Sequence, residues 1–285
     1  MGQWLGAGGC NREKRPSWRP RGGLGEMRIL FIGDIFGEPG RKTVARQVPR
    51  FVGERGVEFV IANAENAAGG FGITPDIAEE LFKAGVHVIT SGNHIWDKKE
   101  IIDYIKEEPR LLRPANYPKG VPGNGSVVST TASGDKIGVL QLMGRVSMPT
   151  LDCPFRVGRE EVDRLRQEVS TIVVDMHAEA TSEKMAMGWY LDGTVSGVFG
   201  THTHVQTADE RILSKGTAYL TETGMTGPSE SVIGIKKEIA IEKFLTQMPR
   251  RFEVASGPCV FSAVLFEVDQ TLGKAVSVER IRLQD

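Results

Sequence analysis

Residues 27–37 read MRILFIGDIFG, and this stretch decides the fold. Arg28 to Gly33 is a short apolar run of the kind that forms a buried strand. Pro39 follows where proline favours the first turn of a helix, and Val44, Val48 and Phe51 then recur at helical spacing. A strand followed at once by a helix indicates the start of a βαβ unit with a parallel sheet.

The same alternation continues toward residue 110. Val57 to Ala62 is a second buried-type strand, and Thr74-Pro75-Asp76 predicts a helix start with a capping threonine. Gly85 ends that helix, after which we expect a strand over Val86 to Thr90 and a helix over Lys98 to Lys106.

Hairpin signals replace this pattern in the second half of the chain. Ser133-Gly134-Asp135 predicts a turn between two strands, and residues 145–158 are rich in Pro and Met and are expected to be irregular. The remaining expected elements are strands at Ser126–Thr131, Lys136–Met143, Thr171–Met176, Val195–Phe199, Arg211–Leu213, Ala218–Thr221, Val260–Val268 and Val276–Leu283, with helices at Arg159–Glu168, Ser182–Leu191 and Lys236–Gln247. Parallel units followed by hairpins predict an α/β fold, a mixed-sheet β-sandwich flanked by helices.

Composition excludes several classes of protein. The chain has 285 residues, 40% of them hydrophobic, and 35 basic against 36 acidic side chains give a net charge of −1. A binder of long nucleic acid needs a basic surplus, and so does a polybasic membrane anchor. Three widely spaced cysteines without a CxxC pair support neither a disulfide framework nor a zinc ribbon. Without a secretory signal or a membrane-length apolar run, we expect a cytoplasmic protein with no membrane partner.

The N-terminal residues differ from the rest. Residues 1–26 are rich in glycine and show no helical or strand period, so we expect a disordered or non-native extension. Residues 27–285 contain no linker and no internal repeat. We therefore expect a single catalytic domain over residues 27–285.

Polar side chains gather just beyond the predicted strands. In open α/β sheets ligands bind at the carboxyl ends of the strands. Each segment alone has an ordinary explanation as a turn or a polar loop, but five coincidences together favour one site. His87, inside an apolar strand, is instead expected to be a packed structural residue. The residues beyond the strands are Asp34, then Asn63, Glu65 and Asn66, then Asn93 and His94, then His177, and finally His202 and His204.

These residue types point to metal chemistry. His, Asp, Glu and Asn without thiolates favour Fe or Mn, and Zn less. The donors exceed the needs of one tetrahedral site, so two divalent or trivalent ions about 3.5–4 Å apart fit better, the arrangement used for displacement at phosphorus. His202 and His204, two residues apart, would point the same way on extended backbone.

The motifs resemble a known superfamily. Gly33-Asp34, Glu65-Asn66, Gly92-Asn93-His94, His177 and the run 200–204 (GTHTH) are similar, in this order, to the five motifs of calcineurin-like metallophosphoesterases. The sequences of residues 63–72 (NAENAAGGFG) and 91–97 (SGNHIWD) resemble the YmdB-like subfamily more closely. The resemblance runs from Met27 to the C-terminus. It implies a metallophosphoesterase-like αββα fold and a phosphodiesterase acting on 2′,3′-cyclic nucleotides.

The resemblance also implies roles for individual residues. Asp34 and His204 would hold the first ion, Glu65 would bridge both, and Asn93, His177 and His202 would hold the second. Phe36 stands where the superfamily usually has a histidine, and Asn66 is the natural substitute ligand. The two ions would lower the pKa of a bridging water to give hydroxide, and His94 would donate a proton to the leaving oxygen.

Other functions stay open at this point. A metal-dependent hydrolase of non-phosphate esters or amides would use a similar donor set, and a regulatory nucleotide-binding protein could keep the site without turnover. The spacing around Gly40 and Lys42 does not match a phosphate-binding P-loop. The neutral charge balance favours a small phosphoester or cyclic nucleotide as substrate, and the apolar stretch Met185 to Trp189 is compatible with a homo-oligomer.

Overall fold

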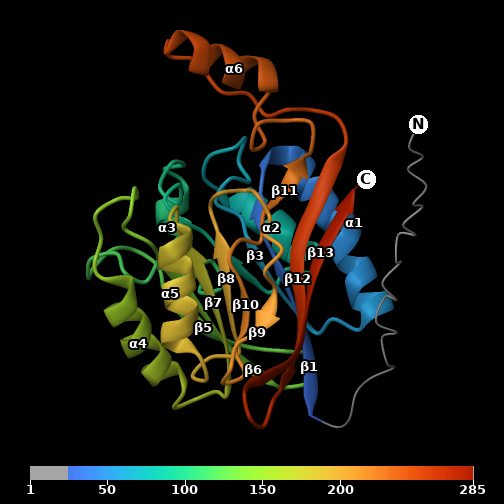
Figure 1. Cartoon of the computed structure of the whole chain (residues 1–285), viewed down its shortest axis with the longest axis vertical. Helices are drawn as coiled ribbons and strands as arrows, with labels where there is room; N and C mark the ends of the chain where they lie inside the picture. The colour runs from blue at the N-terminus through green and yellow to red at the C-terminus, as the bar shows by residue number, and fades with distance from the viewer. Residues whose placement is uncertain (1–24, 285) are drawn as a thin grey trace, which may run out of the picture.

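Two β-sheets form the centre of the protein, and helices cover the outer face of each (Figure 1). The computed structural model describes residues 25–284. The first sheet has the order β2 (Asp34–Ile35), β11 (Met225–Pro228), β12 (Cys259–Asp269), β1 (Glu26–Ile32), β3 (Phe59–Asn63), β4 (Val88–Thr90), with β13 (Lys274–Gln284) also paired to β12. The second has the order β5 (Ser126–Thr130), β6 (Lys136–Met143), β7 (Thr171–His177), β8 (Gly197–Thr201), β10 (Ala218–Leu220), β9 (Arg211–Ile212). The predicted mixed-sheet α/β sandwich is confirmed.

Both sheets contain a run of parallel strands, and these strands place the candidate residues. β1, β3 and β4 run parallel to one another. In the second sheet β6, β7, β8 and β10 are parallel as well. Long antiparallel pairing of β12 with β1 and β13 completes the first sheet. The carboxyl ends of parallel strands share one edge of a sheet, so residues that follow these strands are brought together.

Helices cover the two outer faces and pack buried residues against the sheets. α1 (Gly37–Arg55), α2 (Pro75–Lys83) and α3 (Ile101–Glu107) pack on the first sheet, and α4 (Pro154–Leu165) and α5 (Thr181–Leu191) pack on the second. The start of α2 follows from its sequence, because the Thr74 hydroxyl accepts a hydrogen bond from the Ile77 amide and Pro75 begins the helix. α6 (Lys237–Thr246) projects from the top of the molecule (Figure 1). Within residues 25–284, no helix has both the length and the apolar character that crossing a membrane requires.

Three phenylalanines join the facing sheets. Phe31 of β1, Phe199 of β8 and Phe266 of β12 are fully buried in the cluster between the sheets. The ring centroid of Phe199 lies 5.2 Å from that of Phe31 and 5.0 Å from that of Phe266. Such tilted aromatic pairs add to the stabilisation that burial gives.

Some expected boundaries differ from the structure. The segment 145–158 is not wholly irregular, because α4 begins at Pro154, at a helix position that needs no N–H donor. The strands β2 and β11 were not expected. β2 has only two residues, and the Met-Thr-Gly-Pro sequence of β11 lacks the alternation that indicates a strand. Residues 1–24 of the predicted extension 1–26 lie outside the described residues. Glu26 is the first residue of β1 and pairs with Asp269.

We expect Phe199→Ala to lower the free energy of unfolding by about 3–5 kcal/mol, because it opens a cavity between the two sheets. Urea denaturation followed by circular dichroism measures the change. Phe244→Ala is the matched control, since Phe244 on α6 is 73% exposed and its truncation should stay within about 0.5 kcal/mol. Equal effects of the two substitutions would contradict the importance of this contact.

Candidate metal centre

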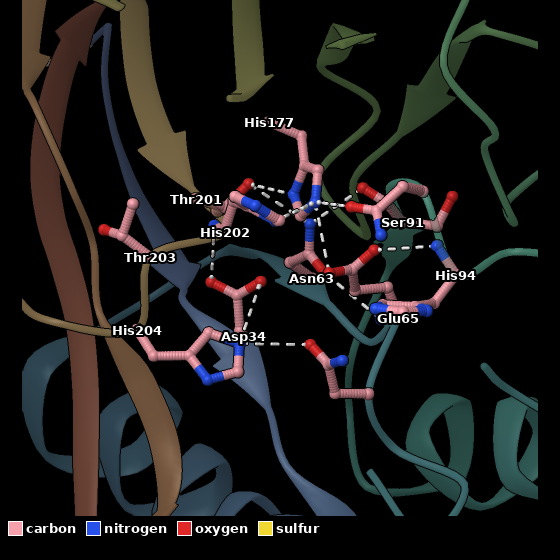
Figure 2. A network of polar contacts seen from close by, with 12 residues as sticks. Asp34, Asn63, Glu65, Ser91, His94, His177, Thr201, His202, Thr203 and His204 are labelled. Atoms are coloured by element: carbon pink, nitrogen blue, oxygen red, sulfur yellow. Dashed lines mark hydrogen bonds and ion pairs between the residues drawn. The ribbon is translucent and has the colours of Figure 1, made fainter. Parts of the chain in front are cut away.

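The polar residues that follow the parallel strands converge at one place between the two sheets (Figure 2). Asp34, Glu65, Asn66, Asn93 and His94 come from the first sheet and its loops. His177, His202 and His204 come from the ends of β7 and β8 in the second sheet. The structure therefore brings all eight predicted site residues into one cluster. Seven of them form two linked groups, and His94 lies beside these groups.

Glu65, Asn93, His177 and His202 form the first group. The His177 Nε2 atom lies 3.1 Å from Glu65 Oε1, 3.1 Å from Asn93 Oδ1 and 3.1 Å from His202 Nδ1. One potential ligand atom from each of Glu65, His177 and His202 lies within 4.8 Å of the others. Four side chains thus direct oxygen or nitrogen atoms at a common point.

Asp34, Asn66 and His204 form the second group. His204 Nε2 lies 3.2 Å from Asn66 Oδ1 and 4.0 Å from Asp34 Oδ1. His204 Nδ1 lies 3.0 Å from the carbonyl oxygen of Ile233, which can only accept, so this contact places the proton on Nδ1 and leaves the Nε2 lone pair facing Asp34 and Asn66. The His202 amide donates to Asp34 Oδ2 over 3.2 Å and links the two groups.

The orientation of His202 and His204 differs from the expectation. We expected both rings to point the same way from extended backbone, and this is wrong. His202 has a φ of 104° and His204 a φ of 66°, so the chain bends between them. One ring presents Nδ1 to the first group and the other presents Nε2 to the second.

Burial and the charges of neighbouring side chains together shift the pKa values of the cluster. Burial raises the pKa of Asp34, and the nearby carboxylates of Glu222 and Glu65 raise it further, against the opposing effect of His177. Burial alone would also raise the pKa of Glu65, but the adjacent His177 ring outweighs it and lowers this pKa to about 2. Burial would lower the pKa of His177, yet Glu65 outweighs it and raises that value to about 9. Burial and the charge of His177 together lower the pKa of His202 to about 3.

Supporting residues fix the His177 ring. The Thr201 hydroxyl donates to Asp175 Oδ1 over 2.7 Å, so it accepts from His177 Nδ1 at 2.9 Å and leaves Nε2 free to face the cluster. Asp175 also accepts from Asn63 Nδ2 and from the Thr90 hydroxyl. We had assigned no role to Asp175. The available signal was its carboxylate, which stands inside an otherwise apolar strand.

His94 lies at the open side of the cluster. Its backbone amide donates to Glu65 Oε2 over 3.2 Å, and its Nδ1 atom lies 2.8 Å from Asp97 Oδ2. Its ring packs nearly perpendicular to that of Phe71, with 5.0 Å between centroids. The His94 side chain is 27% exposed, whereas Glu65 and His177 are almost completely buried. Asp97 is a partner that the sequence did not single out.

The residues fit metal cations. The donors are carboxylate oxygens, carboxamide oxygens and imidazole nitrogens, a set that suits Fe and Mn and also Zn. Asp34 Oδ1 is buried and has no hydrogen-bond partner within residues 25–284, so its lone pairs are available to coordinate a cation. The rings of Phe36 and His204 pack nearly perpendicular with 5.6 Å between their centroids, and Asn66 Oδ1 lies 3.2 Å from His204 Nε2.

A helix-flanked α/β sandwich that gathers this donor set at its strand ends is a metallophosphoesterase-type architecture. The model of the YmdB-like protein family matches residues 30–281. The chain belongs to the YmdB-like family. It is 49% identical over 259 residues to a 2′,3′-cyclic-nucleotide 2′-phosphodiesterase of Bacillus subtilis, covering 91% of this chain and 98% of the relative.

Two solved structures are also similar over nearly their full length. A phosphatase from Mycoplasma pneumoniae has a TM-score of 0.85 and 36% identity, covering 91% of this chain and 94% of its own. A hypothetical protein from Thermus thermophilus has a TM-score of 0.83 and 41% identity, covering 91% of this chain and 100% of its own. Both similarities span the two sheets and the cluster between them.

Gly92→Ala tests the packing of the cluster. A Cβ atom at Gly92 would lie 2.2 Å from His177 Nε2 and 2.4 Å from Glu65 Oε2, so it would displace both side chains. We expect the variant to fold and to bind Mn²⁺ at least about tenfold more weakly in a calorimetric titration. Gly53→Ala is the control, because a Cβ atom there meets nothing within 4 Å. Undiminished Mn²⁺ binding by Gly92→Ala would contradict the geometry.

Proposed function

We propose that this protein is a metal-dependent phosphodiesterase that hydrolyses small phosphoesters, with 2′,3′-cyclic nucleotides as the preferred substrates. The observation that carries the proposal is the convergence of seven oxygen and nitrogen donors beside a partly exposed histidine. The activity of the Bacillus subtilis relative, at 49% identity, supports the choice of substrate. The same reasoning favours a nucleotide over long nucleic acid, because the net charge of −1 offers no extended basic surface.

The proposed ligand assignment follows the two groups. Asp34, Asn66 and His204 would hold one ion, Asn93, His177 and His202 would hold the other, and Glu65 would contact both. Fe or Mn is the expected metal, since oxygen and imidazole donors without thiolates suit these ions. When bound, the ions would supply Lewis-acid stabilisation of charge on the phosphoryl oxygens and would activate water.

The protein's own residues would orient the substrate and deliver a proton. The side chains of His94 and His202 are 27% and 20% exposed, so a phosphoester would enter from their side. Asp97, 2.8 Å from His94 Nδ1, would hold the ring in place, so that Nε2 faces the substrate and can protonate the departing oxygen. Deeply buried Asp34, Glu65 and His177 would stay out of contact with bulk water.

We further propose that residues 27–285 act as one catalytic domain. The first sheet and its loops provide the two carboxylates and two carboxamides of the proposed ligand set, and the second sheet provides the three imidazoles of that set. Neither sheet carries a sufficient ligand set by itself. Separation of the two sheets would therefore abolish the site.

Metal removal tests the proposed function. We expect the chelator-treated protein to lose hydrolysis of 2′,3′-cyclic AMP and to regain it with Mn²⁺ or Fe²⁺ more fully than with Zn²⁺. Release of nucleoside monophosphate, measured by chromatography, follows the reaction. The same protein should leave amides and carboxylic esters intact. Turnover of those compounds alone, or nucleotide binding without hydrolysis, would contradict the proposal.

His94→Ala tests the proton donor. We expect a loss of about 10²–10⁴ in kcat on 2′,3′-cyclic AMP, because the leaving alkoxide would depart without a proton. Loss on p-nitrophenyl phosphodiesters should be much smaller, since p-nitrophenolate leaves readily. Metal content, measured by elemental analysis, should be unchanged.

His87→Gln is the matched control for this substitution. His87 accepts a hydrogen bond from the Val60 amide and stacks on Phe59 at 4.8 Å, so its replacement should affect stability and leave kcat near that of the wild type. Equal losses on good and poor leaving groups in His94→Ala would refute the role of His94.

A further inference from the structure

A buried ion pair lies directly behind the loop that carries His202 and His204. Lys184 of α5 and Glu222, which follows β10, are each 1% exposed. Lys184 Nζ lies 2.5 Å from Glu222 Oε2. The pair belongs to neither group of candidate ligands, and the proposed mechanism does not use it.

Glu222 binds the loop at Thr203, the residue between the two histidines. Glu222 Oε2 accepts from the Thr203 amide at 3.2 Å and from the Thr203 hydroxyl at 2.8 Å. Its other oxygen, Oε1, accepts from the Gly224 amide at 3.1 Å. One carboxylate therefore fixes the middle of the loop to the segment beyond β10, through both backbone and side chain.

The loop requires such a support. His202 and His204 both adopt positive φ, where residues other than glycine are strained and persist only when their surroundings hold them. Further bonds brace the same stretch, since the Thr223 amide donates to Gly200 and the Met225 amide donates to His204. Glu222 provides the charged and fully buried part of this bracing.

Lys184 makes the burial of this carboxylate tolerable. An unpaired buried carboxylate is costly, and a paired and hydrogen-bonded one is much less so. The fit is close, because a Cβ atom at Gly200 would lie 2.7 Å from Lys184 Cδ and 1.8 Å from the Thr221 carbonyl oxygen. The lysine side chain thus reaches Glu222 past a glycine that leaves room for it.

We infer that Glu222, paired with Lys184, is a positioning residue that holds the 202–204 loop so that His202 Nδ1 and His204 Nε2 face their separate groups. This inference rests on the proposed function, in which both histidines bind metal. Groups that orient metal ligands from behind affect metal affinity about 10–100-fold when they are replaced.

The test measures Mn²⁺ binding to the metal-free, folded protein by calorimetry, below the unfolding temperature of every variant. We expect Glu222→Ala to bind Mn²⁺ about 10–100-fold more weakly. Glu222→Gln should restore part of the affinity, because a carboxamide oxygen can still accept from Thr203. Thr203→Val removes one hydrogen bond to Glu222 and keeps the side-chain shape, so it should also weaken Mn²⁺ binding. If Glu222→Ala does not fold, the result for Thr203→Val decides the question.

Asp192→Asn is the control for general loss of stability. Asp192 is also buried and accepts from the Lys215 amide and the Ser214 hydroxyl, but at the opposite end of α5. The Asp192→Asn protein should bind Mn²⁺ with the affinity of the wild type even if its unfolding temperature is lower. Wild-type affinity in Glu222→Ala, or in Thr203→Val where that variant decides, would overturn the inference.

His202→Ala and His204→Ala separate this inference from the proposed function. If both bind Mn²⁺ as the wild type does, or if the wild type binds none, the proposed function fails and the inference fails with it. If they weaken binding and Glu222→Ala does not, the inference alone fails.

Discussion

Burial of opposite charges at the junction of two sheets is the constraint on which the rest of the structure depends. Asp34, Glu65 and His177 are almost completely removed from water. Isolated charges in such a place are very costly, so each must be paired, hydrogen-bonded or bound to a cation. The contact between Glu65 Oε1 and His177 Nε2 at 3.1 Å meets this demand in part. Asp34 Oδ1 has no hydrogen-bond partner in the part of the chain that the structure describes, and a cation there would compensate the charge of the carboxylate.

The apolar frame makes this arrangement possible. Phe31, Phe199 and Phe266 fix the separation of the sheets. The parallel strands of the two sheets then end side by side. The carboxylates and carboxamides of the proposed ligand set come from one sheet and its imidazoles from the other, so the chemistry depends on packing between the two sheets. Side chains behind the cluster complete the frame, since Asp175 orients His177 through Thr201, and Glu222 holds Thr203.

Much of this could be predicted from the sequence, because strand periodicity and chain order determine which residues follow which strand. The fold class and the meeting of Asp34, Glu65, Asn93 and His177 depend only on that placement. The bend at His202 and His204 could not be predicted, since the positive φ values depend on contacts with Asp34 and Glu222. The first of these partners lies 168 residues away along the chain.

The supporting residues were missed for the same reason. Asp175 stands within a strand that otherwise reads as apolar, and Glu222 follows a short strand in a segment of threonines. Neither position has a local pattern that reveals its partner. Lys184 likewise reads as an ordinary helix residue, although it is buried against Glu222. Such pairs become visible only when both sheets and α5 are in place.

The central claim is that donors from both sheets converge on a pair of cations. A crystal of the protein grown with Mn²⁺ and measured at the manganese absorption edge tests it most directly. We predict two anomalous peaks, one contacting Asn93, His177 and His202, the other contacting Asp34, Asn66 and His204, with Glu65 touching both. Peaks confined to other parts of the surface, or an absence of manganese from the junction of the sheets, would contradict the claim.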